Sequence, residues 1–117
     1  MTIPRLFKKK SMRIQRIYYG GTPKYKIEIS VDGFDMDTDT WSVTITGGGH
    51  SRAYAKSECI HNSNGWFIGI DTTEYGLGTY YATLTALVPD TDFTSGIRTE
   101  VEQVILCVVV DMPADLV

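Results

Sequence analysis

Apolar and polar residues alternate in one short segment after another along this chain of 117 residues. A period of two places successive side chains on opposite faces of a β-strand, so each segment can bury one face and expose the other. Val, Ile, Thr, Tyr and Trp dominate these segments, as is typical of strands. The clearest expected strands cover residues 25–31, 41–46, 66–70, 81–88 and 99–110, and weaker ones cover 13–19 and 51–57.

Clusters of Gly, Pro, Asn and Asp separate these segments at intervals of roughly ten residues, and no segment has a convincing helical repeat. The pattern predicts an all-β fold, namely an antiparallel immunoglobulin-like β-sandwich of about seven strands, with a small closed barrel as the alternative. The last strand ends in the apolar run of residues 104–110. We expect this run to be buried on both faces or paired with another chain.

The size of 13.1 kDa is that of one domain. We expect a basic N-terminal arm at residues 1–12, a β-sandwich domain at 13–110 and a C-terminal tail at 111–117. No apolar run reaches the ~18–20 residues of a membrane-spanning helix. The N-terminal lysines lack the apolar region of a secretory signal, so we expect neither a membrane association nor export.

The charges are divided unevenly along the chain. Residues 1–26 hold eight of the eleven basic residues and no acidic one, so three basic residues face all fourteen acidic ones in the remainder. The basic segment could contact an acidic partner, its own acidic domain or a neighbouring copy. We expect protein contacts through an interface formed by Arg5, Phe7, Lys8, Lys9 and Lys10. The acidic strands argue against a nucleic-acid partner.

Two groups of residues could bind metal ions. Asp35, Asp37 and Asp39 match the opening of an EF-hand loop, but its central Gly and terminal Glu are missing. A solvated acidic turn therefore fits better than a calcium site. Cys59 and His61 would share one face of a strand, yet a zinc site needs about four ligands. We expect Cys59 and the second cysteine to be ordinary buried thiols and expect no cofactor.

The sequence contains no nucleophile elbow, P-loop or dinucleotide-binding motif. We therefore expect no catalytic residue, no enzymatic activity and no small-molecule substrate. Trp41 and Trp66 fall on core faces by parity, and one residue of each adjacent pair of tyrosines at positions 18–19 and 80–81 should be exposed. Exposed tyrosines suit a protein interface or a surface that stacks on sugars.

Five segments carry a resemblance to a known group of proteins. They are FDMD at residues 34–37, WSVTI at 41–45, GWFIGIDT at 65–72, YGLGTY at 75–80 and VPDTDFTSGIRTEV at 88–101. Together they resemble small β-sandwich structural proteins of phages and prophages of Bacteroides-type gut bacteria. They are more loosely similar to the N-terminal domain of phage baseplate upper proteins. The resemblance covers about residues 13–110 and leaves the basic arm outside.

The resemblance implies a structural role in the virion without catalysis, with other virion proteins and copies of the chain as partners. Assembly would take place in the cytoplasm of the bacterial host, and attachment to the head or to the tail stays open. The alternative is a carbohydrate- or host-surface-binding β-sandwich module. In the segment at 88–101 we expect Asp90, Asp92, Arg98 and Glu100 to form an ion-pair network and Phe93 to be covered.

Overall fold

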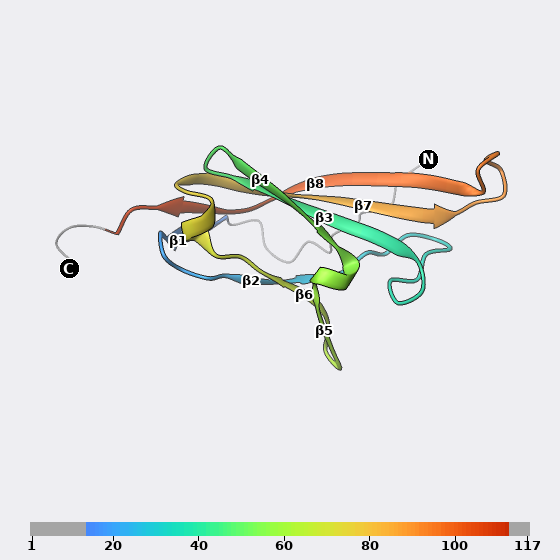
Figure 1. Cartoon of the computed structure of the whole chain (residues 1–117), viewed down its shortest axis with the longest axis horizontal. Coiled ribbons are helices and arrows are strands. Elements are labelled where there is room, and N and C mark those ends of the chain that lie inside the picture. The colour runs from blue at the N-terminus through green and yellow to red at the C-terminus, as the bar shows by residue number, and fades with distance from the viewer. Residues whose placement is uncertain (1–13, 113–117) are drawn as a thin grey trace.

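The computed structural model describes residues 14–112, which form an all-β fold with two sheets (Figure 1). Eight strands and two short 3₁₀ helices lie within these residues. They are β1 (Gln15–Tyr18), β2 (Lys24–Ile27), β3 (Thr40–Gly47), β4 (His50–Ala55), η1 (Lys56–Glu58), β5 (Ile60–Asn62), β6 (Gly65–Gly69), η2 (Thr72–Glu74), β7 (Gly78–Pro89) and β8 (Ile97–Val110). No helix in this part of the chain is long and apolar enough to cross a membrane.

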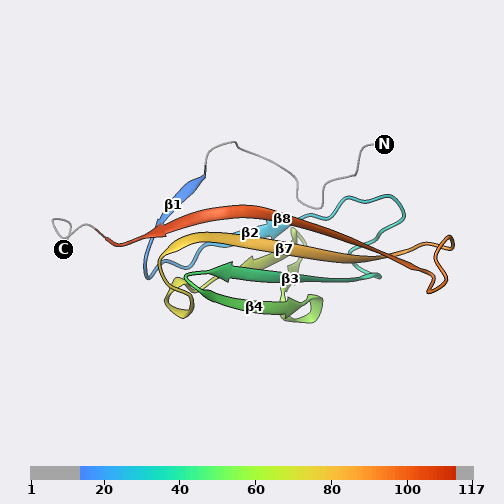
Figure 2. The ribbon, with the colours of Figure 1, turned by 90° about the horizontal axis from the view of Figure 1, so that it is seen from above.

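The two sheets differ in size. The larger sheet has the strand order β1-β8-β7-β3-β4 and the smaller one the order β2-β6-β5. The long β7–β8 hairpin runs along the larger sheet and reaches past its other strands at one end (Figure 2). All neighbouring strands are antiparallel except β1, which pairs with the end of β8 in parallel from Gln15 opposite Cys107 to Tyr18 opposite Val110.

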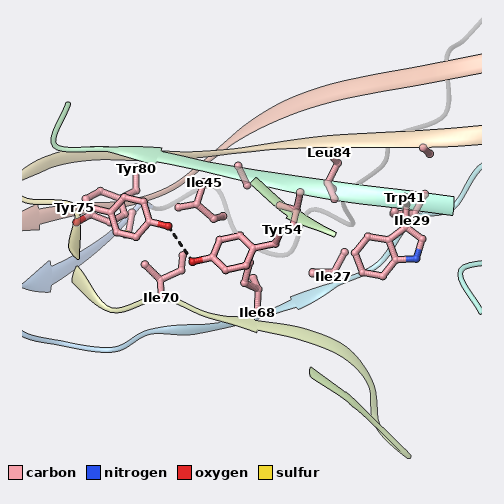
Figure 3. Close-up of a cluster of buried hydrophobic side chains, with 14 of the residues drawn as sticks. Ile27, Ile29, Trp41, Ile45, Tyr54, Ile68, Ile70, Tyr75, Tyr80 and Leu84 are labelled. Carbon is pink, nitrogen blue, oxygen red and sulfur yellow. Dashed lines mark hydrogen bonds between the residues drawn. The ribbon is translucent and has the colours of Figure 1, made fainter. Parts of the chain in front are cut away.

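The core lies between the inner faces of the two sheets, as the close-up in Figure 3 shows. Alternate residues of the strands supply it, as period-two patterning requires. The fully buried large side chains include Trp41, Ile45 and Leu84 of the larger sheet and Ile27 of the smaller one. Trp66 of β6 is partly buried against this core, and its ring meets that of Trp41 edge to face at a centroid distance of 5.2 Å.

Three expectations about the fold need correction. The described residues hold eight strands rather than about seven, because the short β5 was not foreseen. The sheet is not purely antiparallel, since β1 joins β8 in parallel. The end of β8 is not buried on both faces by the described residues either: Cys107 and Val109 are buried, whereas 47% of Ile105 is exposed, because no second layer within residues 14–112 covers the outer face there. Pairing of this run with another chain, the other expectation, stays a prediction. Residues 1–12 and most of the expected tail, 113–117, lie outside the described residues.

A glycine at the end of β3 makes room for a core tyrosine. A Cβ atom on Gly47 would clash with the ring of Tyr80, which is fully buried. The next residue, Gly48, has a φ of +56° and lies against the backbone of Tyr75 and Gly76. Both positions in the β3–β4 turn therefore require residues without a side chain.

Candidate interaction surface

The outer face of the larger sheet carries no charged residue on β3, β4, β7 or β8. We call this surface the threonine face, and its members are the residues whose side chains point away from the core on these four strands. They are Thr40, Ser42, Thr44, Thr46, Ser51, Ala53, Ala55, Thr79, Tyr81, Thr83, Thr85, Leu87, Pro89, Ile97, Thr99, Val101, Gln103, Ile105, Val108 and Val110. In a chain with 21% charged residues, a sheet face of this extent without one is unusual for a solvated surface.

The threonine face has a hydroxyl-bearing part and an apolar part. Thr44 lies opposite Thr83 across β3 and β7, and Gln103 of β8 donates a hydrogen bond from Nε2 to Thr83 Oγ1 at 3.1 Å. On β8 a row of apolar side chains is exposed, with 61% of Val101 and 47% of Ile105 accessible. Interface cores are depleted in charged residues, so this composition suits contact with another protein.

The opposite, inner side of β8 is charged near the β7–β8 loop. Arg98 donates from Nη1 to Asp90 Oδ2 at 2.6 Å and from Nε to Glu100 Oε1 at 2.9 Å. The pKa of Asp90 is lowered, first by the backbone N–H of Asp92 and then by Arg98. The expected network is therefore confirmed for Asp90, Arg98 and Glu100. Asp92 contributes its backbone N–H to Asp90 rather than an ion pair. The expectation for Phe93 was wrong: 48% of it is exposed, because its loop projects beyond both sheets.

The acidic turn before β3 is closed by hydrogen bonds within the protein. Asp35 Oδ1 accepts from the backbone N–H of Asp37, and Asp39 Oδ2 accepts from that of Asp35, both at 2.8 Å. The Lys56 ammonium group donates to the carbonyl oxygens of Asp37 and Asp39 at 2.8 Å each. A positively charged group thus already lies against this turn, where it disfavours a bound cation.

The residues considered for zinc do not converge. His61 stacks on the Trp66 ring at a centroid distance of 3.9 Å, and its Nε2 lies 3.6 Å from Asp37 Oδ1. Cys59 is partly buried against the core, and burial raises the pKa of its thiol to about 11. Burial also raises the pKa of the Cys107 thiol on β8. Within residues 14–112 no three potential metal ligands come together.

One exposed residue was expected in each adjacent pair of tyrosines. This is confirmed for residues 80–81 and wrong for residues 18–19. Tyr80 is fully buried and its neighbour Tyr81 is partly exposed. Tyr18 and Tyr19 are both exposed, because β1 ends at Tyr18 and the chain turns away from the core. The expected interface residues Arg5, Phe7, Lys8, Lys9 and Lys10 lie outside the described residues.

A buried threonine in the segment GWFIGIDT was not singled out from the sequence. Thr72 is fully buried; its hydroxyl accepts from the Gly20 N–H and donates to the Gly21 carbonyl oxygen, both at 2.8 Å. The preceding Asp71 accepts from the backbone N–H of Thr73 and so caps η2. The Asp-Thr pair at the end of a strand was the feature of the sequence that could have indicated these hydrogen bonds. The role of this pair is structural.

No protein-family model matches this chain, and neither a curated protein nor a solved structure is significantly similar to it.

Proposed function

We propose that this protein is a non-enzymatic structural component of a bacteriophage virion, held in place by protein–protein contacts. The supporting observation is the uncharged threonine face, which offers a broad sheet surface to a neighbouring virion protein. The resemblance of residues 13–110 to phage structural proteins supports the same proposal. The proposal includes an immunoglobulin-like topology for the core formed by the two sheets.

The energetics of burial favour this face over the others. Covering Val101, Ile105 and Ile97 would remove apolar surface from water at about 25 cal/mol per Å². No charged group on the face would lose its hydration, and burying an unpaired charge is expensive. The outer face of the smaller sheet, in contrast, carries Lys24 and Lys26, which a partner would have to pair.

The alternative, a carbohydrate-binding module, requires aromatic rings gathered on one accessible surface. Trp66 is engaged by both Trp41 and His61. The exposed rings of Tyr18 and Tyr19 lie at the end of β1. Phe93 lies in the β7–β8 loop, at the other end of the molecule (Figure 1). This dispersion of the rings supports the structural role over sugar stacking.

The proposal is tested on phage particles from the bacterium that carries the gene. We expect quantitative mass spectrometry of gradient-purified particles to find the protein at a fixed ratio to the major structural proteins. Absence from the particles would overturn the proposal, and specific binding on a glycan array would then favour the alternative.

The role of the threonine face is tested by incorporation of variants. Val101→Lys places a charge on an exposed position of the face, and we expect it to lower the particle-bound fraction at least tenfold. Ser63→Lys, at the exposed tip between β5 and β6, is the matched control and should incorporate normally. Equal incorporation of both variants would exclude this face as the docking surface.

A further inference from the structure

The strand β4 forms one border of the larger sheet (Figure 2). It spans His50–Ala55 and pairs with β3 on one side, and within residues 14–112 no strand lies on its other side. Proteins commonly protect such an edge with a proline, a lysine or a β-bulge. The pairing of β4 with β3 is continuous, and the strand contains neither proline nor lysine. Its edge is therefore a template for another strand.

Alternate residues of β4 direct their backbone groups away from β3. The Ala55 N–H donates to Glu58 Oε1 at 2.9 Å, and the Ala55 carbonyl oxygen accepts from the Cys59 thiol at 3.6 Å, so both groups face the edge. Because bonded positions alternate along an antiparallel pair, the N–H and C=O groups of Ala53 and Ser51 face the edge as well. Ala53 is thus the middle one of three edge-facing residues.

The side chains along this edge leave room for a close neighbour. The three edge-facing residues are small and exposed, and they belong to the threonine face. On the opposite face of β4, Cζ of Arg52 lies 4.6 Å from the centre of the Tyr54 ring, and its Nη1 is 3.4 Å from Glu74 Oε2. The one arginine of the strand is thus held by partners within its own chain.

A second copy of the chain fits this edge in one register. The two antiparallel registers with the longest overlap are centred on Arg52 and on Ala53. They allow the same number of backbone hydrogen bonds, since the Ala55 N–H is already bonded to Glu58. The first register opposes two arginines directly, which is destabilising. The second places Arg52 opposite Tyr54 of the partner subunit, an aromatic ring on which a guanidinium group can stack. The charges therefore select the register centred on Ala53.

We propose that two copies of the chain pair antiparallel through their β4 edges, with a two-fold axis beside Ala53. This axis is perpendicular to the sheet, so the threonine faces of both copies lie on the same side and form one continuous surface. The turn at Gly48 and Gly49 then lies beside η1 of the other copy, where the absence of side chains avoids a clash. The inference does not depend on the proposed virion role, because it concerns the isolated protein.

Sedimentation equilibrium of the full-length protein at increasing concentration tests the pairing. We expect the mass to rise from 13.1 kDa towards twice that value. Ala53→Pro removes the edge-facing N–H, a loss that an edge strand tolerates in the monomer, and should weaken dimerisation at least tenfold. Ala53→Val keeps the N–H and is the matched control, which should dimerise like the unmodified protein. A protein that stays monomeric at millimolar concentration, or equal dimerisation of the two variants, would overturn the proposal.

Cysteine cross-linking tests the register without a proline. In a Cys59→Ser background, Ala53→Cys should form a disulfide between two copies, because directly opposed residues bring their Cα atoms within the ~5.5 Å that a disulfide spans. Ser51→Cys is the control on the same strand and face. In the proposed register it faces Ala55 of the partner subunit, four positions from the partner's Ser51, and should cross-link at least tenfold more slowly. Equal rates, or faster linking of Ser51→Cys, would contradict the proposed pairing.

Discussion

The hydroxyl of Tyr25 is buried without a strong hydrogen-bond partner. Among the described residues it meets only the thiol of Cys107, a weak hydrogen-bonding group. Burial, and secondarily this thiol, raise the pKa of Tyr25. The hydroxyl of Tyr80, in contrast, donates to the Gly76 carbonyl oxygen at 2.6 Å. The two tyrosines thus differ in whether their buried hydroxyl group has a strong hydrogen-bond partner.

This difference predicts opposite effects of the same substitution. Tyr25→Phe removes an unsatisfied group and should leave the free energy of unfolding unchanged or raise it by up to ~1 kcal/mol. Tyr80→Phe removes a made hydrogen bond and should lower it by ~1–2 kcal/mol. Urea denaturation of both variants provides the comparison. A larger loss for Tyr25→Phe than for Tyr80→Phe would contradict this account of the core.

The two thiols should react slowly in the folded protein. The pKa of the Cys59 thiol is about 11, and that of the buried Cys107 thiol is also raised, so little thiolate is present at neutral pH. We expect labelling with a thiol reagent at pH 7.5 to be slow in the native protein and complete in urea. Rapid native labelling of both cysteines would refute this prediction.

At the scale of elements, Thr72 connects η2 to the turn between β1 and β2 through two side-chain hydrogen bonds. Thr72→Val preserves the shape of the side chain but leaves the Gly20 N–H without this acceptor. We expect the free energy of unfolding to fall by ~1–3 kcal/mol. Thr85→Val on the threonine face is the matched control and should change it by less than ~0.5 kcal/mol. Similar denaturation midpoints for the two variants would show that this connection is not important.

The turn with Asp35, Asp37 and Asp39 should not bind calcium tightly. The carboxylates of Asp35 and Asp39 accept backbone N–H groups, and that of Asp37 accepts from the Trp66 indole at 3.1 Å. Lys56 occupies two carbonyl oxygens of the turn. Isothermal titration calorimetry should therefore detect no binding at micromolar calcium. A dissociation constant in the micromolar range or below would mean that the lysine is displaced and that the turn reorganises around the ion.

Local pattern determines which elements the sequence predicts well. The alternation around Trp41 and Leu84 assigned β3 and β7 and their buried faces, because one face of each strand lies against the core. The short β5 was missed because all three of its residues are exposed and leave no apolar alternation. The parallel pairing of β1 was missed because the choice of a partner 92 positions away depends on the sheet edge and not on local residues.

At the scale of the whole molecule, the unequal sizes of the sheets explain why one strand changes character along its length. The β7–β8 hairpin extends past the smaller sheet (Figure 1), so the inner face of β8 has no apolar layer to contact near the loop. Arg98 and Glu100 occupy that face and pair with each other. Further along the strand, where the second sheet covers it, Cys107 and Val109 are buried.

The parallel pairing of β1 with β8 also has a mechanical consequence, because these strands lead to the two ends of the described chain. Tension between the ends pulls the two strands in opposite directions along each other, so their hydrogen bonds share the load. Tension between Thr40 and Ala55 would instead separate β3 from β4 one bond at a time. Single-molecule pulling from residues 14 and 112 should therefore require the higher rupture force. A lower rupture force for residues 14 and 112 than for Thr40 and Ala55 would mean that the β1–β8 pairing does not resist shear. A higher force would mean that the first and last described strands hold the fold together when its ends are pulled apart.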